Sequence, residues 1–163
     1  GQNDRWCHAN RGVSGIDGTV STAVGDALAR PEKEVWIVLG DLSMLYDLNG
    51  LIVDPLPSNL RIVVLNNGGG NIFRWLPGPE KVDLVDPYFQ TSQLSKNRLN
   101  HAAALHGLQY FCATDTHELE RALDEVQSAR QAVLCEVVTD GEVSGLAYKE
   151  LLKILGEGNE RRD

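Results

Sequence analysis

An aspartate and an asparagine in the middle of the chain have the side chains and the spacing of a site for a metal-bound diphosphate. Asp41 comes just after the apolar run 35–39, and Asn67 comes just after the run 61–65. If both runs are parallel strands, both side chains should face the crevice at the carboxyl ends of the strands. Mg²⁺ prefers oxygen ligands and is usually held by one or two protein groups together with phosphate oxygens. The carboxylate of Asp41, the amide oxygen of Asn67 and the backbone carbonyl of Gly69 therefore predict a site for Mg²⁺ and a diphosphate.

The residues around this pair fit a phosphate as well as a metal. Leu42 and Ser43 begin a predicted helix, and the free N–H groups at the start of a helix favour phosphate oxygens. The turn after Asn67 is rich in glycine, which allows backbone angles that would aim the carbonyl of Gly69 inward. Two ordinary alternatives stay open for the residues taken singly, since Asp41 would also suit a helix cap and Asn67 a common Asn-Gly turn.

The apolar residues predict a sheet whose strands are separated by helices. Continuous apolar runs are typical of parallel strands covered on both faces. Such runs, together with two shorter ones, predict strands at 6–9, 35–39, 61–65, 108–112 and 133–138. Helical spacing gives these predicted helices: the segment after Asp17, the segment after Ser43, 97–106, the segment after Asp115 and 147–155. The order predicts an α/β fold, a three-layer sandwich around a mostly parallel sheet of five to six strands.

Capping residues and proline mark the limits of the predicted helices. Asp17 is expected to cap the helix that stops before Pro31, and Asp115 with Glu118 forms a capping-box pattern. The segment 68–98 shows little periodicity and is expected to be partly disordered.

Composition and charge narrow the class of protein. The 163 residues are 42% hydrophobic, which fits a single domain, residues 1–163, with its own core. A formal net charge of −8 argues against nucleic acid or an anionic membrane as a partner. No segment approaches the ~20 apolar residues of a membrane span, and Cys7, Cys112 and Cys135 are expected to be buried free thiols of a cytoplasmic protein. The chain starts without a Met and is expected to be a piece of a longer protein, with a frayed tail at 156–163.

A set of short motifs between residues 10 and 73 resembles one enzyme family. The motifs are NRGVSGIDG at 10–18, GDLS at 40–43, YDLN at 46–49, NN at 66–67 and GNIF at 70–73. Together they resemble the C-terminal, diphosphate-binding domain of the MenD family, the 2-succinyl-5-enolpyruvyl-6-hydroxy-3-cyclohexene-1-carboxylate synthases of menaquinone biosynthesis. Leu42 stands where the general thiamin diphosphate motif has a glycine, as it does in MenD-like sequences, and beyond residue 73 the match is looser, chiefly NHAAA at 100–104.

The resemblance implies a cofactor and a role for each matching residue. The cofactors would be thiamin diphosphate and Mg²⁺, and the residues that contact them would be Ser14, Gly15, Ile16, Gly40, Asp41, Leu42, Ser43, Asn67 and Gly69. Ile16 would lie beneath the thiazolium ring and force the bent shape of the cofactor. Arg11 would hold a substrate carboxylate, for which a planar guanidinium suits bidentate pairing, and Ile72 and Phe73 would line the substrate pocket. The ordinary alternatives are a surface ion pair for Arg11, core packing for Ile16 and loop packing for Ile72 and Phe73.

The resemblance also implies which reaction the family catalyses and which catalytic group this chain does not contain. The family uses thiamin diphosphate to decarboxylate 2-oxoglutarate and transfers the remaining succinyl unit to isochorismate. The Glu that activates the cofactor belongs to a separate, N-terminal pyrimidine-binding domain, so no catalytic residue is assigned in this chain and the chain alone is expected to be inactive. The full-length enzyme is expected to be a homo-oligomer.

Two rival functions stay open on the sequence. One is the small subunit of a two-chain 2-oxoacid decarboxylase, against which the motif at 10–18 argues. The other is a non-catalytic phosphate-binding module of Rossmann-like type, although the chain lacks Gly-x-Gly-x-x-Gly after the first predicted strand and a Walker lysine.

Overall fold

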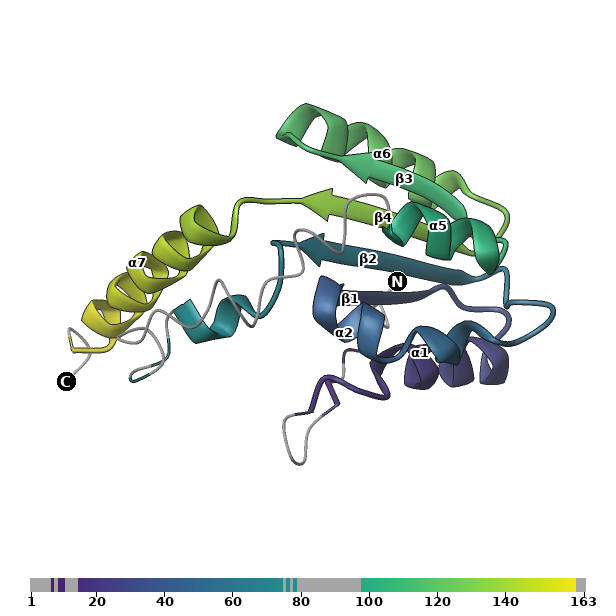
Figure 1. The fold of residues 1–163 in the computed structure, drawn as a ribbon, viewed down its shortest axis with the longest axis horizontal. Coiled ribbons are helices and arrows are strands. Elements are labelled where there is room, and N and C mark those ends of the chain that lie inside the picture. The colour runs from purple at the N-terminus through teal and green to yellow at the C-terminus, as the bar shows by residue number, and fades with distance from the viewer. Residues whose placement is uncertain are drawn as a thin grey trace, which may run out of the picture.

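Parallel strands form the centre of the molecule. The computed structural model describes residues 7, 9–10, 15–74, 76, 78 and 98–160. In this part of the chain, four strands pair in parallel in the order β1–β2–β4–β3 (Figure 1). The strands are β1 (Val35–Gly40), β2 (Leu60–Asn66), β3 (Gln109–Ala113) and β4 (Val133–Val138).

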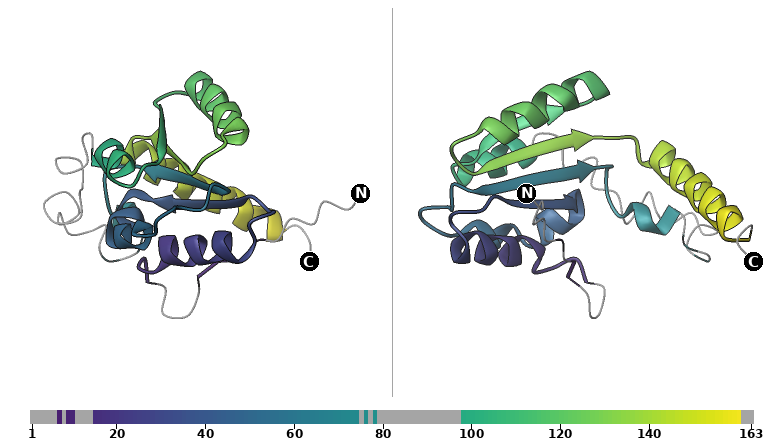
Figure 2. Two further views of the ribbon diagram at one scale, coloured as in Figure 1. Left: turned by 90° about the vertical axis from the view of Figure 1, so that its right-hand side faces the viewer. Right: turned by 180° about the vertical axis from the view of Figure 1, so that it is seen from behind.

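Helices cover both faces of the sheet. One face is covered by α1 (Thr19–Ala29), α2 (Asp41–Tyr46) and α5 (Arg98–Leu105), and the other by α6 (Thr116–Ser128). Two short 3₁₀ helices, η1 (Leu48–Leu51) and η2 (Asn71–Arg74), follow α2 and β2. The long helix α7 (Gly141–Glu160) lies outside these layers, beyond the carboxyl ends of the strands and against η2 (Figure 2). The three-layer α/β fold is thus confirmed.

The register of the sheet explains the continuous apolar runs. Ile62 on β2 pairs with Ile37 on β1 and Leu134 on β4, and these three side chains face the helices α1, α2 and α5. The next residue, Val63, pairs with Cys135 on the opposite face, under α6. Both faces of the central strands are therefore buried, so neither face requires polar side chains.

The outer face of β1 is open. Trp36 and Val38 point away from α1 and α2, and Val38 is 64% exposed. The strand count of five to six was too high for the described part of the chain. Of the predicted strand 6–9, Cys7 and Ala9 are not in a strand, and Trp6 and His8 lie outside the described residues.

The start of α1 corrects one expectation from the sequence. Asp17 does not cap this helix, because the N-cap position is Gly18, in a left-handed conformation with φ 72°, and no capping side chain acts there. Instead Asp47, at the end of α2, accepts hydrogen bonds from the backbone N–H and the hydroxyl of Ser21, each at 2.7 Å. The first turn of α1 is thus fixed to the segment that follows the candidate metal residue.

The predicted helix after Ser43 is broken in two. It forms the six-residue α2 and then η1, with Asp47 between them. At Gly50 a Cβ atom would lie 2.6 Å from the hydroxyl oxygen and 2.8 Å from the backbone nitrogen of Ser21. The close approach of α1 at this point explains why glycine is required here and why a regular helix does not continue.

The other helix predictions are confirmed with shifted ends. Asp115 accepts a hydrogen bond from the backbone N–H of Glu118 at 2.8 Å, as the capping box requires, while the Glu118 carboxylate accepts from Thr114 rather than from Asp115. The last helix begins six residues before the predicted start, because Asp140 caps it by accepting from the N–H of Val143 at 2.8 Å. Fraying at 156–163 stays a prediction.

Candidate metal and diphosphate site

The candidate metal residues follow neighbouring parallel strands. Gly40 ends β1 and pairs with Leu65 near the end of β2, so Asp41 and Asn67 both lie just beyond the same edge of the sheet. All strands end on the side of the molecule where η2 and α7 lie (Figure 1). Asp41 and Asn67 therefore lie at the carboxyl edge of the sheet, which is the edge where open α/β sheets bind ligands.

Asp41 places a carboxylate at this edge in a setting poor in water. It is the first residue of α2 and its side chain is only 1% exposed. Leu42 and Ser43 follow it in the first turn, as expected, although α2 is only six residues long. A buried carboxylate interacts strongly with a nearby cation, because the surrounding dielectric is lower than that of water.

Asn67 places an amide oxygen at the same edge. Within the described residues, its buried Oδ1 atom accepts no hydrogen bond. A buried polar atom without a partner costs about 1–3 kcal/mol, and coordination to a cation would remove that cost. The residue present therefore fits a metal site.

The turn after Asn67 keeps the third predicted ligand available. Gly68 and Gly69 have φ angles of 82° and 136°, which other residues rarely adopt. The carbonyl of Gly69 accepts a hydrogen bond from the N–H of Asn71 at 2.9 Å. A carbonyl oxygen has two lone pairs, so this bond leaves one for a cation.

Helix α7 closes this turn from the outside. A Cβ atom at Gly141 would lie 2.6 Å from the carbonyl oxygen of Asn67 and 3.3 Å from Oδ1 of Asn71. Only glycine fits such an approach, so the first turn of α7 packs directly on the loop. No sequence pattern predicts that Gly141 lies beside Asn67, since the contact depends on tertiary packing.

The loop before α1 reaches the start of α2. The hydroxyl of Ser43 donates a hydrogen bond to the carbonyl oxygen of Ile16 at 2.8 Å. The side chain of Ile16 is 39% exposed, so it is not an ordinary core residue of the described chain. Gly15 is exposed beside it, whereas Arg11 and Ser14 lie outside the described residues.

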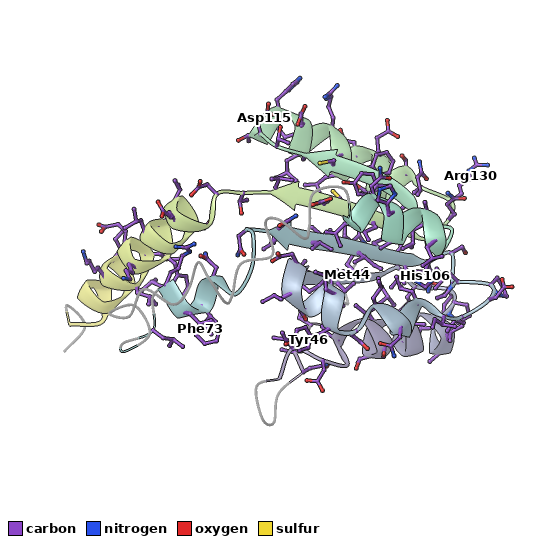
Figure 3. All side chains as sticks on the ribbon, viewed as in Figure 1. Met44, Tyr46, Phe73, His106, Asp115 and Arg130 are labelled. Atoms are coloured by element: carbon purple, nitrogen blue, oxygen red, sulfur yellow. The ribbon has the colours of Figure 1, made fainter. Side chains whose placement is uncertain are left out.

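The two predicted pocket residues lie on η2. Ile72 is 46% exposed and Phe73 is half-buried, and η2 is in contact with α7. Figure 3 shows Phe73 at the end of the molecule where the strands finish, whereas His106 and Arg130 lie at the opposite end.

A buried polar cluster beside the site was not assigned from the sequence. Glu136 on β4 is 5% exposed and accepts hydrogen bonds from the amide of Asn66 and the hydroxyl of Tyr110, each at 2.5 Å. Burial, and then the hydrogen bond to Glu136, raises the pKa of Tyr110. One signal was available, because Glu136 is the only charged residue in the predicted strand 133–138.

Within the described residues, the cysteines do not form a metal site. All three are free, but only Cys135 is buried, and Cys7 and Cys112 are exposed, which corrects the expectation that all are buried. Burial raises the pKa of the Cys112 and Cys135 thiols. Among the described residues, no group of three or more His, Cys, Asp or Glu could hold a metal.

Comparison with known protein families identifies the class of protein to which this fold and these strand-end residues belong. Residues 2–137 match the family described as thiamine pyrophosphate enzyme, C-terminal TPP binding domain. The chain belongs to this family, whose ligand is thiamin diphosphate under its other name. Among the described residues, no helix is long and apolar enough to cross a membrane.

The chain is also similar to several proteins named 2-succinyl-5-enolpyruvyl-6-hydroxy-3-cyclohexene-1-carboxylate synthase. It is 38% identical to the synthase of Flavobacterium psychrophilum over 146 residues and 39% identical to that of Cytophaga hutchinsonii over 148 residues, which is 90% of this chain in each case. It is 59% identical to that of Desulfotalea psychrophila over 87 residues, 53% of this chain and 15% of the relative. The chain spans about a quarter of the first two relatives, 26% of each.

Proposed function

We propose that this chain is the cofactor-binding domain of a thiamin diphosphate- and Mg²⁺-dependent transferase, the synthase that decarboxylates 2-oxoglutarate and transfers the succinyl unit to isochorismate. The observation that carries the proposal is the pair of strand-end residues Asp41 and Asn67, with the buried Oδ1 of Asn67 lacking a hydrogen bond within the described residues. The family of the chain and the names of its relatives support it.

Three groups of this chain would hold the metal. The carboxylate of Asp41, the amide oxygen of Asn67 and the carbonyl oxygen of Gly69 are hard oxygen ligands of the kind Mg²⁺ takes, and diphosphate oxygens and water would complete its shell. The formal net charge of −8 disfavours an anionic cofactor at long range. Binding of the diphosphate therefore depends on the cation and on local N–H groups.

The remaining cofactor contacts come from the ends of α1 and α2. Ser14, Gly15 and Ile16 precede α1, and Gly40, Leu42 and Ser43 flank Asp41. The Ser43 hydroxyl holds the carbonyl of Ile16, which leaves the partly exposed Ile16 side chain available to support the cofactor ring. Thiamin diphosphate, when bound, supplies the decarboxylation and carbon-transfer chemistry.

Arg11, Ile72 and Phe73 would recognise the substrates. Both proposed substrates are dicarboxylates, and the guanidinium of Arg11 suits bidentate pairing with one carboxylate. Ile72 and Phe73 lie on η2, which follows β2 at the carboxyl edge of the sheet, and Figure 3 shows Phe73 at that end of the molecule. The role of Arg11 rests on the sequence motif alone, and the roles of Ile72 and Phe73 rest on the motif together with the location of η2.

The proposal requires a second domain. The Glu that activates the cofactor would come from an N-terminal pyrimidine-binding domain, and the exposed Trp36 and Val38 on β1 suit a chain that packs against more protein. A homo-oligomeric, cytoplasmic full-length enzyme belongs to the same proposal.

Calorimetric titration of the chain with thiamin diphosphate, with and without Mg²⁺, tests the site. The parent chain should bind the cofactor only with Mg²⁺, and Asp41→Ala should abolish that binding. Asp124→Ala removes an exposed carboxylate on α6 and serves as the matched control, which should bind like the parent. Equal binding by Asp41→Ala and the parent would show that the metal site lies elsewhere.

A further inference from the structure

A line of hydrogen bonds crosses the sheet and ends at the candidate metal loop, residues 67–69. The hydroxyl of Tyr110 on β3 donates to Oε2 of Glu136 on β4, and the amide nitrogen of Asn66 on β2 donates to Oε1 of the same carboxylate. On its other side, Oδ1 of Asn66 accepts the backbone N–H of Gly68 at 3.1 Å. Gly68 stands between the proposed ligands Asn67 and Gly69.

A carboxylate at this position is not explained by packing. Glu136 lies on a strand whose other residues are apolar, and both of the donors that reach it are neutral. Burying a carboxylate with neutral partners is costly compared with an apolar side chain of similar size. A residue kept at such a cost is expected to do something that an apolar side chain would not do.

The carboxylate determines which way the Asn66 amide points. Both carboxylate oxygens of Glu136 accept hydrogen bonds, one of them from the amide nitrogen of Asn66, so the amide turns its nitrogen towards Glu136 and its oxygen towards Gly68. The backbone of Asn66 is held separately, because its carbonyl accepts the N–H of Thr139 at 2.8 Å. The end of β2 is thus fixed by main chain and side chain alike.

We propose that Glu136 is a positioning residue for loop 67–69. By orienting the amide of Asn66, it fixes the N–H of Gly68 and with it the turn that presents the Asn67 side chain and the Gly69 carbonyl. Its effect on cofactor affinity rests on the proposed function, whereas its effect on the order of the loop does not.

The first test uses the chain without cofactor. Glu136→Leu keeps the approximate volume and removes both acceptors, Glu136→Gln keeps one acceptor oxygen, and Tyr110→Phe is the control that leaves the link from Glu136 to Gly68 intact. Hydrogen exchange of individual amides, measured by NMR, should be at least tenfold faster at Gly68 in Glu136→Leu and intermediate in Glu136→Gln. In Tyr110→Phe it should stay within about twofold of the parent.

A purely structural role would give a different pattern. In that case the amides in the middle of β2 and β4 would accelerate as much as Gly68, and Tyr110→Phe would behave like Glu136→Leu. Either pattern, or unchanged exchange at Gly68, would overturn the proposal. If Glu136→Leu fails to fold, the comparison of Glu136→Gln with Tyr110→Phe decides it in the same way.

The second test is the affinity for thiamin diphosphate and Mg²⁺, measured by calorimetry. The Kd should rise about tenfold or more in Glu136→Leu, rise less in Glu136→Gln, and change less than about threefold in Tyr110→Phe. If the parent chain did not bind, the proposed cofactor site would be wrong, and the exchange at Gly68 would still decide the role of Glu136. If the parent bound and Glu136→Leu bound equally well, the positioning role would be excluded.

Discussion

Asn67 differs from its neighbour Asn66 in how its side chain is used. The amide of Asn66 makes two hydrogen bonds, to Glu136 and from Gly68. The Oδ1 of Asn67 makes none within the described residues, although it is buried. Two adjacent asparagines therefore differ: the side chain of Asn66 is used in hydrogen bonds within the fold, whereas the oxygen of Asn67 is left available for the proposed cation.

The contrast predicts opposite effects of two alanine substitutions. Asn67→Ala should not lower the free energy of unfolding of the cofactor-free chain, because its oxygen has no hydrogen bond to lose and the cost of burying it unpaired is removed. Its affinity for thiamin diphosphate with Mg²⁺ should nevertheless fall at least tenfold. Urea denaturation and calorimetry measure the two effects, and Asn66→Ala, expected to destabilise by about 1–3 kcal/mol, is the control. A large loss of stability in Asn67→Ala would make Asn67 a structural residue.

Arg11 is the residue whose role depends most on the substrates. In the full-length enzyme, Arg11→Lys keeps the charge and loses the bidentate geometry, so it should impair substrate use by roughly 1.5–3 kcal/mol. Cofactor affinity should hardly change, because the diphosphate would be held by the proposed Mg²⁺ and by the start of the helix near Ser43. Steady-state kinetics for both substrates, with a separate cofactor titration, check this. Unchanged kinetics would return Arg11 to a surface ion pair, and a collapse in cofactor affinity would make it a phosphate ligand.

At the scale of elements, the two helices beside the site are tied to each other. Asp47 after α2 caps the first turn of α1, and Ser43 in α2 holds the loop that precedes α1. Gly50 allows η1 to approach Ser21 of α1 closely. The segment with Ile16 and the segment with Asp41 therefore keep a fixed relation.

This tie predicts a clear loss of stability when Asp47 is removed. Asp47→Ala leaves the N–H and the hydroxyl of Ser21 without their acceptors, and should lower the free energy of unfolding by about 1–3 kcal/mol. Asp26→Ala, which breaks the ion pair with Arg30 on the surface of α1, should cost less than about 1 kcal/mol. Chemical denaturation of both variants gives the comparison, and equal costs would mean that the cap contributes nothing beyond a surface contact.

The elements that the sequence predicts well are those with a local pattern. The runs 35–39, 61–65 and 133–138 each lie within one residue of an observed strand. The central strands β2 and β4 are buried on both faces, which leaves a continuous apolar run, whereas β1 is apolar although its outer face is exposed. Asp47 and Glu136 had no assigned role, since their partners Ser21 and Asn66 are 26 and 70 residues away. Contacts between residues so far apart in the sequence form only in the folded chain, and they leave no periodic pattern in the sequence.

At the scale of the whole molecule, the proposed function gives this chain one side of an active site. The strand-end residues would hold the metal and the diphosphate, in keeping with the family of the chain, and the group that activates the cofactor is expected from another domain. The open face of β1 with Trp36 and Val38 also marks a surface that the described chain does not cover by itself.

The chain alone should therefore have no synthase activity. Incubation with thiamin diphosphate, Mg²⁺, 2-oxoglutarate and isochorismate should give neither carbon dioxide release nor loss of isochorismate above background, while a full-length synthase assayed in parallel turns over. Addition of the separate N-terminal portion is expected to restore some turnover. Substantial activity of the chain alone would favour a self-contained enzyme instead.

The strand order also means that β2 is synthesised well before its neighbour β4. β2 lies beside β4 rather than beside β3, so the loop after β2 waits for a strand whose Glu136 follows Asn66 by 70 residues. At a ribosomal rate of about 5–20 residues per second, that interval lasts roughly 4–14 seconds. During this time β2 can pair only with β1, and its other edge is open to other nascent chains. Loop 67–69 therefore reaches its final form only after β4 has been synthesised.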